Sequence, residues 1–361
     1  MNPAVIAKSA KNILSSVEIN FNRAAGREFV PKQPDMLHIE TCSTCNLKCR
    51  FCAYVKKENA KVAMKDELFA DLIAQAVDMG YHRFELTPCT GDVFMDHHIF
   101  NKLQLLEDNP AVKSYQFFTN FTILKPEDVE RLIGLKKLCS LTISIYGHDL
   151  STFIAITQST EKIYQRLIGN LETLYGLLDR RSFALDFGFR STRDAPRSCD
   201  SDIMRLLERY TTAGIKVRTS NVYSNWGGFI SQDDVKGLAI DITKPNRTYK
   251  NGACTLLFTS VQVMANGVVN GCAVKDVEAS LRIGDLNEQP LREILSTRNP
   301  SYMKLIEEQQ SGHFRPVCQS CDYYKSIYHM RSVYRKGEMQ TQSLAEFRDR
   351  LDAKQPEPEA A

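Results

Sequence analysis

The chain of 361 residues contains no apolar run that approaches the length of a membrane span, and it has one tryptophan. A transmembrane helix needs about 20 consecutive apolar residues, so we expect no membrane association. The N-terminus lacks an apolar stretch followed by a small-residue cleavage site, which argues against a secretion signal. The net charge is only +3 and the basic residues are scattered, so no nucleic-acid or membrane surface is predicted. We therefore expect a cytoplasmic protein.

Cysteine, in contrast, is abundant, with eleven residues. Disulfides are rare in a reducing compartment, where clustered cysteines are more often metal ligands. Eight cysteines form two groups, within residues 42–52 and 254–321, and the others stand alone at Cys89, Cys139 and Cys199. The length suffices for one large domain and a smaller one.

The first group reads Cys42-Ser-Thr-Cys45-Asn-Leu-Lys-Cys49-Arg-Phe-Cys52 and follows the apolar run Met36–Ile39. Three thiolates spaced C-x-x-x-C-x-x-C, on a loop leaving a strand, can turn toward one point and hold an iron–sulfur cluster. One iron then has no protein ligand and is open to a small molecule with an amine and a carboxylate. A zinc site with four ligands and a disulfide cluster are the alternatives. We interpret Cys42 as a bystander at the strand end.

Strand and helix patterns alternate from residue 36 to residue 222. The expected strands cover residues 36–39, 82–87, 114–119, 141–145, 183–189 and 215–222, and the expected helices 66–79, 99–107, 126–133, 163–178 and 201–212. This alternation predicts parallel β-α units, in either an open sheet or a partial barrel. Both architectures collect functional groups at the carboxyl ends of the strands.

The alternation stops around residues 236–251, where we place a domain boundary. Beyond it, Asn266-Gly267 lies between the apolar runs 256–264 and 268–272, which predicts a β-hairpin. A helix over 291–309, broken near Asn299-Pro300, and a last helix from about Asp322 should follow. We expect residues 1–35 to form a short helix and a linker, and residues 339–361 to form a helix and a disordered tail.

The second cysteine group comes from three places around this hairpin. Cys254 precedes it, Cys272 follows it, and Cys318 and Cys321 form a C-x-x-C turn. Four thiolates can complete the ligand set of an iron–sulfur cluster, and on these residues alone zinc fits equally well.

Both groups resemble motifs of one enzyme superfamily. The run from Cys45 to Cys52 resembles the signature of radical S-adenosylmethionine (SAM) enzymes, and residues 252–321 resemble their SPASM/twitch extension. The resemblance covers roughly residues 36–325. It implies a partial (β/α)6 TIM-type barrel over 36–235 and a small α+β cap with the hairpin over 250–338. It also implies a 4Fe–4S cluster bound by three cysteines and SAM. Because no cysteine follows Cys321, we expect one auxiliary 4Fe–4S cluster. The implied ligands are Cys45, Cys49, Cys52, Cys254, Cys272, Cys318 and Cys321.

The resemblance also implies SAM-binding positions. Thr90-Gly91-Asp92 stands where the family has Gly-Gly-Glu, although an ordinary turn with Asp92 as a helix N-cap is the alternative. Asn120, in a Thr-Asn turn, and Ser144 match third- and fourth-strand positions. Arg190 ends the fifth strand and is suited to a bidentate pair with the SAM carboxylate, or to a surface ion pair.

Four further side chains are weaker candidates. Trp226 precedes two glycines and is either a wall of the SAM or substrate site or a core residue. Tyr146 and Asp276 are candidate catalytic residues, with Asp276 a base beside the auxiliary cluster. His148 is a candidate for substrate contact, whereas His38 reads as a buried strand residue.

The implied activity is reductive cleavage of SAM to a 5′-deoxyadenosyl radical, which abstracts a substrate hydrogen. An auxiliary cluster predicts oxidation or epimerisation of a small molecule, a carbohydrate or natural-product intermediate, with the cluster as electron acceptor. Only 35 residues precede Met36, too few for a leader-binding module, which favours a small molecule over a peptide. The alternatives are a peptide maturase and a non-catalytic metal-binding scaffold. We expect a flavodoxin or ferredoxin as reductant.

Overall fold

Six parallel strands form the centre of the molecule. The computed structural model describes residues 3–32, 36–87, 89–195, 200–244, 249–330 and 340–353, with side chains from residue 12 onward. The strands lie side by side in chain order: β2 (Met36–Ile39), β3 (Arg83–Glu85), β4 (Ser114–Thr119), β5 (Leu138–Tyr146), β6 (Ala184–Arg190) and β7 (Lys216–Ser220). Cys199 and the expected disordered tail from residue 354 lie outside the described residues.

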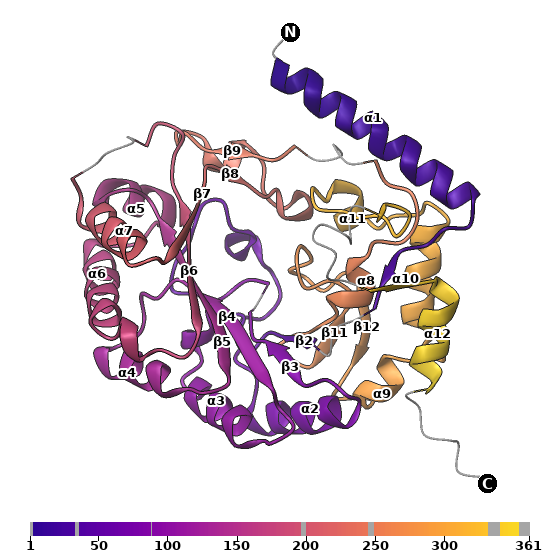
Figure 1. Cartoon of the computed structure of the whole chain (residues 1–361), viewed down its shortest axis with the longest axis horizontal. Coiled ribbons are helices and arrows are strands. Elements are labelled where there is room, and N and C mark those ends of the chain that lie inside the picture. Colours follow the sequence, from indigo (N-terminus) through magenta and orange to yellow (C-terminus); the bar gives the residue numbers. More distant parts are fainter. Residues whose placement is uncertain are drawn as a thin grey trace.

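Helices cover the outer face of this curved sheet (Figure 1). They are α2 (Asp66–Asp78), α3 (Ile99–Asp108), α4 (Pro126–Gly134), α5 (Leu150–Thr157), α6 (Glu161–Gly176) and α7 (Asp202–Thr212). In α2 the buried side chains Phe69, Leu72, Ile73 and Ala76 follow the helical repeat, so one stripe faces the sheet. The predicted partial barrel is therefore confirmed.

Helix α5 was not expected from the sequence pattern. It begins where the Asp149 carboxylate accepts a hydrogen bond from the Thr152 backbone N–H at 2.8 Å. Its eight residues are mostly apolar and show little periodicity, which explains why the pattern did not reveal it. The expected strand over residues 215–222 is also divided, into β7 and β8 (Val222–Tyr223), and β8 pairs with β9 (Asp241–Ile242).

The predicted hairpin extends the barrel sheet. Strands β10 (Gln262–Val263) and β11 (Val268–Asn270) are antiparallel, β12 (Arg282–Asp285) pairs with β11, and β10 pairs in parallel with β2. The nine-stranded order is β12-β11-β10-β2-β3-β4-β5-β6-β7. The expectation of a strand from residue 256 was wrong, because Leu256–Thr259 forms the short helix α8.

Four helices complete the extension: α9 (Leu291–Ile294), α10 (Pro300–Gln310), α11 (Pro316–Ser320) and α12 (Leu344–Ala353). The break at Asn299-Pro300 is confirmed, since the Asn299 side chain caps α10. The expectation of a helix starting at Asp322 was wrong. There the chain is extended beside Cys254, with hydrogen bonds from the Thr255 N–H to the Lys325 carbonyl and from the Ile327 N–H to the Ala253 carbonyl.

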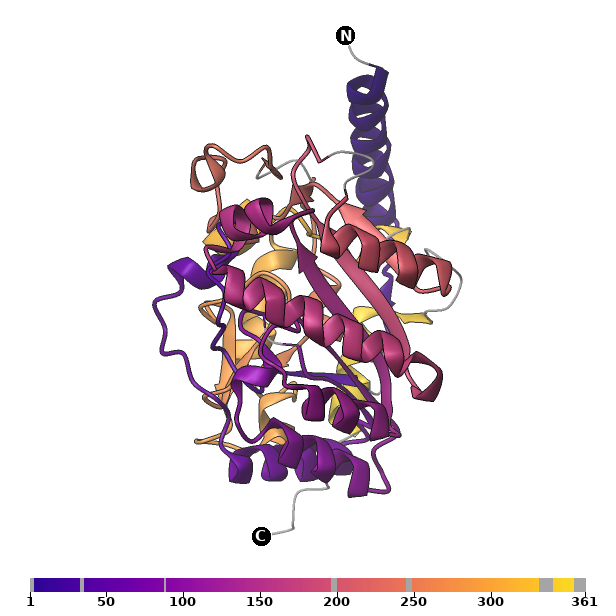
Figure 2. The same cartoon turned by 90° about the vertical axis from the view of Figure 1, so that its left-hand side faces the viewer.

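The N-terminal helix α1 (Pro3–Ala24) has 22 residues and is longer than expected. It projects from the body of the molecule, as Figures 1 and 2 show. Beyond it, β1 (Val30–Pro31) pairs with β13 (Thr341–Gln342), so the predicted linker contains a strand. Within the described ranges, no helix has both the length and the apolar character needed to cross a membrane.

Candidate active site and auxiliary metal centre

The carboxyl ends of the parallel strands surround a cavity of about 290 Å³. This volume is near the lower end for small-molecule sites, about 300–1,000 Å³. Every residue that the sequence suggested for the SAM-cleaving cluster and for SAM lies along its wall: Cys45, Cys49, Cys52, Thr90, Gly91, Asp92, Asn120, Ser144, Arg190 and Trp226. The candidate Tyr146 lines it too. Six separate chain segments therefore meet at this cavity, as expected for the carboxyl ends of neighbouring parallel strands.

The three cysteines form one wall of this cavity. Burial raises the pKa of Cys45 to about 12 and that of Cys52 to about 11, and it raises the pKa of Cys49 well above its usual value. Neutral thiols are thus favoured unless a cationic centre stabilises the thiolates, as metal binding does. Cys42 is not part of this wall. Its sulfur accepts a hydrogen bond from the Thr44 N–H at 3.4 Å, which favours a structural role.

Asp92 is 2% exposed and its carboxylate is engaged by the protein. It accepts hydrogen bonds from the Asn120 N–H at 2.7 Å, the Phe94 N–H at 3.0 Å and the Thr119 hydroxyl at 3.0 Å. Burial raises the pKa of Asp92 to about 6. The bond to Phe94 is the N-cap that the sequence offered as an alternative. These contacts favour Asp92 as a residue that positions Asn120, whose amide lies 3.7 Å from the Cys45 sulfur.

Gly91 brings the turn after β3 against the cysteine loop. Its φ is +112°, and a Cβ atom there would lie 2.5 Å from the Cys42 carbonyl oxygen. The Asp92 N–H donates to the Thr44 carbonyl at 2.8 Å, next to Cys45. The neighbouring Thr90 is 3% exposed, and its hydroxyl has no hydrogen-bond partner within the described part of the chain. Thr90 therefore offers the cavity a polar group that its own fold does not satisfy.

Ser144, Tyr146 and Arg190 line the cavity at the carboxyl ends of β5 and β6. Tyr146 on β5 is paired in register with Arg190 on β6, which brings both to the rim. The positive charge of Arg190 lowers the pKa values of Cys49 and Cys52, against the larger effect of burial. The Tyr146 ring lies 5.3 Å from the Phe51 ring, and burial raises its pKa, so the phenol remains protonated at neutral pH.

Trp226 lies against the cysteine loop, where its indole N–H donates to the Phe51 carbonyl at 2.9 Å. The two following glycines approach α11 closely. A Cβ atom on Gly227 would lie 2.5 Å from a Val317 methyl, and one on Gly228 would lie 2.9 Å from the Ser320 Cβ. The close approach suggested by the sequence is therefore between this loop and α11.

Several residues that line the cavity were not predicted from the sequence, among them Glu85, Cys89 and Phe118. Glu85 points inward from β3, accepts a hydrogen bond from the Gln116 amide at 2.8 Å, and lies 3.8 Å from the His38 ring nitrogen. The alternation of β3 and the position of Cys89 just after it were the available signals.

A second, smaller cavity contains the other four cysteines, Cys254, Cys272, Cys318 and Cys321. Burial raises the pKa of all four thiols, to about 11 for Cys254 and about 12 for Cys272. N–H groups point at the sulfurs, from the Gln309 amide to Cys318 at 3.4 Å and from the Tyr323 backbone to Cys321 at 3.3 Å. Four sulfur donors with such support fit a closed metal centre.

Four thiolates are the ligand set of both an iron–sulfur cluster and a structural zinc ion.

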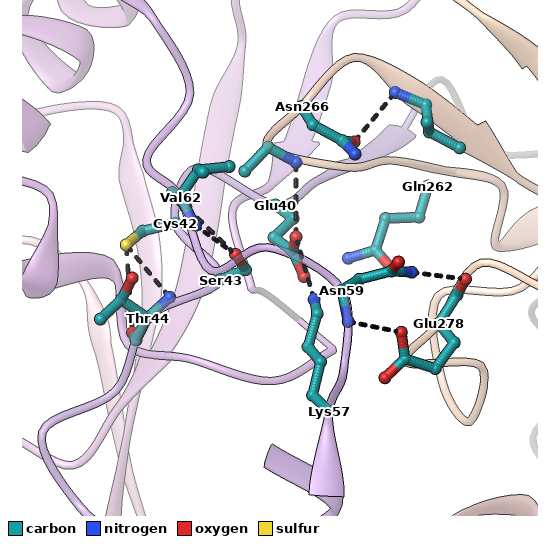
Figure 3. A network of polar contacts seen from close by, with 12 residues as sticks. Glu40, Cys42, Ser43, Thr44, Lys57, Asn59, Val62, Gln262, Asn266 and Glu278 are labelled. Atoms are coloured by element: carbon teal, nitrogen blue, oxygen red, sulfur yellow. Dashed lines mark hydrogen bonds and ion pairs between the residues drawn. The ribbon is translucent and has the colours of Figure 1, made fainter. Parts of the chain in front are cut away.

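One segment separates the two cavities. Ala273 and Val274 line the first cavity, whereas Cys272 and Lys275 line the second. Figure 3 shows polar contacts between the segment that follows the cysteine loop, at Asn59, and Glu278 of the extension. There the Glu278 carboxylate accepts hydrogen bonds from the Glu58 and Asn59 N–H groups at 2.7 and 3.1 Å.

Asp276 and His148 have contacts that favour structural roles. The Asp276 carboxylate accepts hydrogen bonds from the Ser280 and Leu281 N–H groups at 3.0 and 2.7 Å, and closes a turn beside the second cavity. His148 contacts the Ser191 hydroxyl at 2.9 Å and is not among the residues of the first cavity. These contacts disfavour Asp276 as a base and His148 as a substrate contact.

Comparison with known proteins agrees with this arrangement. Residues 254–322 match the SPASM family, an iron–sulfur cluster-binding domain, which confirms the predicted extension. No curated protein sequence matches the chain.

Solved structures share the fold at low sequence identity. Streptococcus suis SuiB bound to the precursor peptide SuiA has a TM-score of 0.55 at 15% identity, over 91% of this chain and 78% of that one. BtrN in complex with AdoMet and 2-DOIA has a TM-score of 0.52 at 15% identity, over 81% of this chain and 94% of that one. Native anSMEcpe with AdoMet and the Kp18Cys peptide has a TM-score of 0.50 at 13% identity, over 88% of this chain and 96% of that one. The predicted fold class, a partial barrel followed by the extension, is thus confirmed.

Proposed function

We propose that this protein is a radical SAM enzyme that oxidises or epimerises a small molecule, a carbohydrate or natural-product intermediate. The observation that carries the proposal is the first cavity, where a three-cysteine loop meets every residue expected to contact SAM. The SPASM match to residues 254–322 supports an auxiliary iron–sulfur centre behind its wall. The AdoMet bound to the structural neighbours BtrN and anSMEcpe supports SAM as the ligand.

In this proposal Cys45, Cys49 and Cys52 would hold a 4Fe–4S cluster with one iron available to SAM. When bound, that cluster supplies the electron that cleaves SAM to a 5′-deoxyadenosyl radical. Ser144 and Asn120 would hydrogen-bond SAM, and the Arg190 guanidinium would pair with its carboxylate. Asp92 holds the Asn120 backbone in place through its 2.7 Å hydrogen bond.

The remaining wall would exclude water, which would otherwise quench a reactive carbon radical. The Trp226 indole N–H donates a hydrogen bond to the Phe51 carbonyl, which holds the indole against the cysteine loop. The Phe51 ring packs against the Tyr223 ring, with ring centroids 4.5 Å apart. Phe118 and Tyr146 add aromatic surface where a substrate would lie. Tyr146 stays protonated there and would donate a hydrogen bond to a substrate hydroxyl.

The auxiliary centre suits an electron acceptor because of its position. Its ligand Cys272 directly precedes Ala273 and Val274, which line the first cavity. A substrate radical in that cavity would therefore lie one short segment from the second centre. A centre closed by four thiolates has no open iron, which leaves electron transfer or structural support as its roles. The reductant would be a flavodoxin or ferredoxin, in the cytoplasm.

Anaerobic reconstitution with iron and sulfide, followed by dithionite and SAM, tests the proposal. The wild type should release 5′-deoxyadenosine, measured by liquid chromatography with mass spectrometry. Replacing Cys45, Cys49 and Cys52 by Ala should abolish release, and Cys42→Ala, the matched control, should retain it. Release by the triple variant would overturn the proposal.

A peptide maturase is the second candidate. It is favoured by the likeness in fold to SuiB bound to its precursor peptide, which extends over 91% of this chain. Incubation with deuterium-labelled candidate peptides and small molecules under the conditions above distinguishes the two, because only the true substrate should transfer deuterium to 5′-deoxyadenosine.

A further inference from the structure

Cys89 is a thiol in the first cavity that none of the roles above uses. It follows β3, is 8% exposed, and lines the cavity together with Cys45, Cys49 and Cys52. Its side chain packs against Ala53, directly after the cysteine loop, and against Val277 of the extension. The sulfur therefore lies beside the candidate SAM site, on the side facing the auxiliary centre.

The cavity at this point also has an unsatisfied polar group. The hydroxyl of the adjacent Thr90 is buried and has no partner among the described residues, although it lines the same cavity. Buried hydroxyls of this kind are normally paired, so the position calls for a bound molecule. Cys89 thus stands next to a place where a ligand group is expected.

We propose that Cys89 donates a hydrogen atom to the substrate radical, so that the reaction is an epimerisation. This inference rests on the proposed function and deepens it, by choosing inversion over oxidation. Burial raises the pKa of the Cys89 thiol well above its usual value, and the Lys57 charge lowers it by less, so Cys89 carries its hydrogen at neutral pH. An S–H bond is weaker than an aliphatic C–H bond, which makes the transfer favourable.

The step balances in atoms and electrons. The substrate first loses one hydrogen atom from carbon to the 5′-deoxyadenosyl radical, which becomes 5′-deoxyadenosine. The resulting carbon radical then gains the hydrogen atom of Cys89 on the opposite face, so the S–H bond breaks and a new C–H bond forms. Cys89 is left as a thiyl radical, and one electron from a ferredoxin- or flavodoxin-class reductant, with one proton from water, restores the thiol. The substrate undergoes no net oxidation.

The test needs no knowledge of the substrate. In D2O the Cys89 thiol exchanges to S–D, and SAM cleavage without substrate should then place one deuterium in 5′-deoxyadenosine. In Cys89→Ser the O–H bond is too strong to donate, so the deuterium content should fall to the level found in H2O. Cys139→Ser is the matched control, because Cys139 is exposed on β5. It should keep the wild-type deuterium content.

The isotope content, and not the amount formed, is the readout. Unlabelled 5′-deoxyadenosine from the wild type, or equal labelling in Cys89→Ser, would overturn the role of Cys89 and leave the proposed function standing. Absence of 5′-deoxyadenosine from the wild type would instead refute the proposed function.

A second measurement is independent of turnover. Methyl methanethiosulfonate should modify Cys89 of the reconstituted protein, detected by peptide mass spectrometry, and saturating SAM should protect Cys89 at least tenfold while Cys139 stays reactive. Modification of Cys89 unaffected by SAM, or no modification at all, would place its sulfur away from the SAM site and contradict the inference.

Discussion

Replacement of Gly91 by Ala tests how the turn after β3 fits against the cysteine loop. The new Cβ would lie 2.5 Å from the Cys42 carbonyl oxygen and 2.9 Å from the Ser43 carbonyl carbon. Both contacts are with backbone, so no side chain can rotate to relieve them. The φ of +112° is also strained for any residue with a side chain.

The two effects can be added. Backbone strain of this kind costs about 1–3 kcal/mol, and overpacking a tight site costs about 1–3 kcal/mol. We expect Gly91→Ala to lower the free energy of unfolding by about 2–6 kcal/mol. Because the Asp92 N–H donates to the Thr44 carbonyl beside Cys45, the displaced turn should also shift the cysteine loop and weaken SAM binding.

Urea unfolding followed by circular dichroism measures the first effect, at matched iron content. Gly169→Ala is the control, since Gly169 lies inside α6 and an added Cβ there would meet no neighbouring atom within 4 Å. Ala at such a helical position should raise the free energy of unfolding by about 0.5–1 kcal/mol. If Gly91→Ala unfolds at the same urea concentration as the wild type and binds SAM equally well, the inference that this turn packs closely against the cysteine loop is refuted.

Three further substitutions test other parts of the site. Asp92→Ala should cost about 3 kcal/mol or more of unfolding free energy, because it leaves the Asn120 and Phe94 N–H groups without an acceptor, and a wild-type urea midpoint would contradict this. Ser144→Ala should weaken SAM binding by roughly two- to tenfold in equilibrium dialysis with iron content unchanged, and unaltered affinity would return Ser144 to a structural role. Replacing Cys254, Cys272, Cys318 and Cys321 together by Ala should remove one cluster, seen as a lower iron content, while SAM cleavage persists. Loss of both clusters or precipitation would show that the second centre mainly supports the fold.

Regular periodicity accounts for what the sequence predicted well. Strand β4 over Ser114–Thr119 has the expected bounds, and helix α2 ends within one residue of its expected end. In both elements the apolar residues of the repeat are the ones that are buried, so the sequence period identifies the element. The cavity residues followed from the same pattern, since parallel strands bring their carboxyl ends to one edge.

Long-range contacts account for what the sequence did not predict. The parallel pairing of β10 with β2 joins the extension to the barrel sheet, and no local pattern encodes that neighbour. Residues after Asp322 look helical in isolation, yet backbone hydrogen bonds to Ala253 and Thr255 hold them extended beside Cys254. The helix-like signal was overridden by tertiary pairing.

Asp92 illustrates the same limit at the site. Its position in a Thr-Gly-Asp turn suggested direct SAM contact, but its carboxylate faces three protein donors. The direction of a side chain depends on the loop after β4, 27 residues or more away, which the local sequence does not reveal. Cys89 stands alone in the sequence, yet the fold brings it to the wall of the same cavity as the cysteine loop.

The central claim is that the loop containing Cys45, Cys49 and Cys52 holds a cluster with one iron open to SAM. Electron–nuclear double resonance on the reduced, reconstituted protein with SAM labelled by 15N at its amino group tests this directly. We expect a 15N coupling to the cluster in the wild type, and none when the three cysteines are replaced by Ala. A wild-type spectrum that saturating SAM leaves unchanged, without any 15N coupling, would contradict the claim.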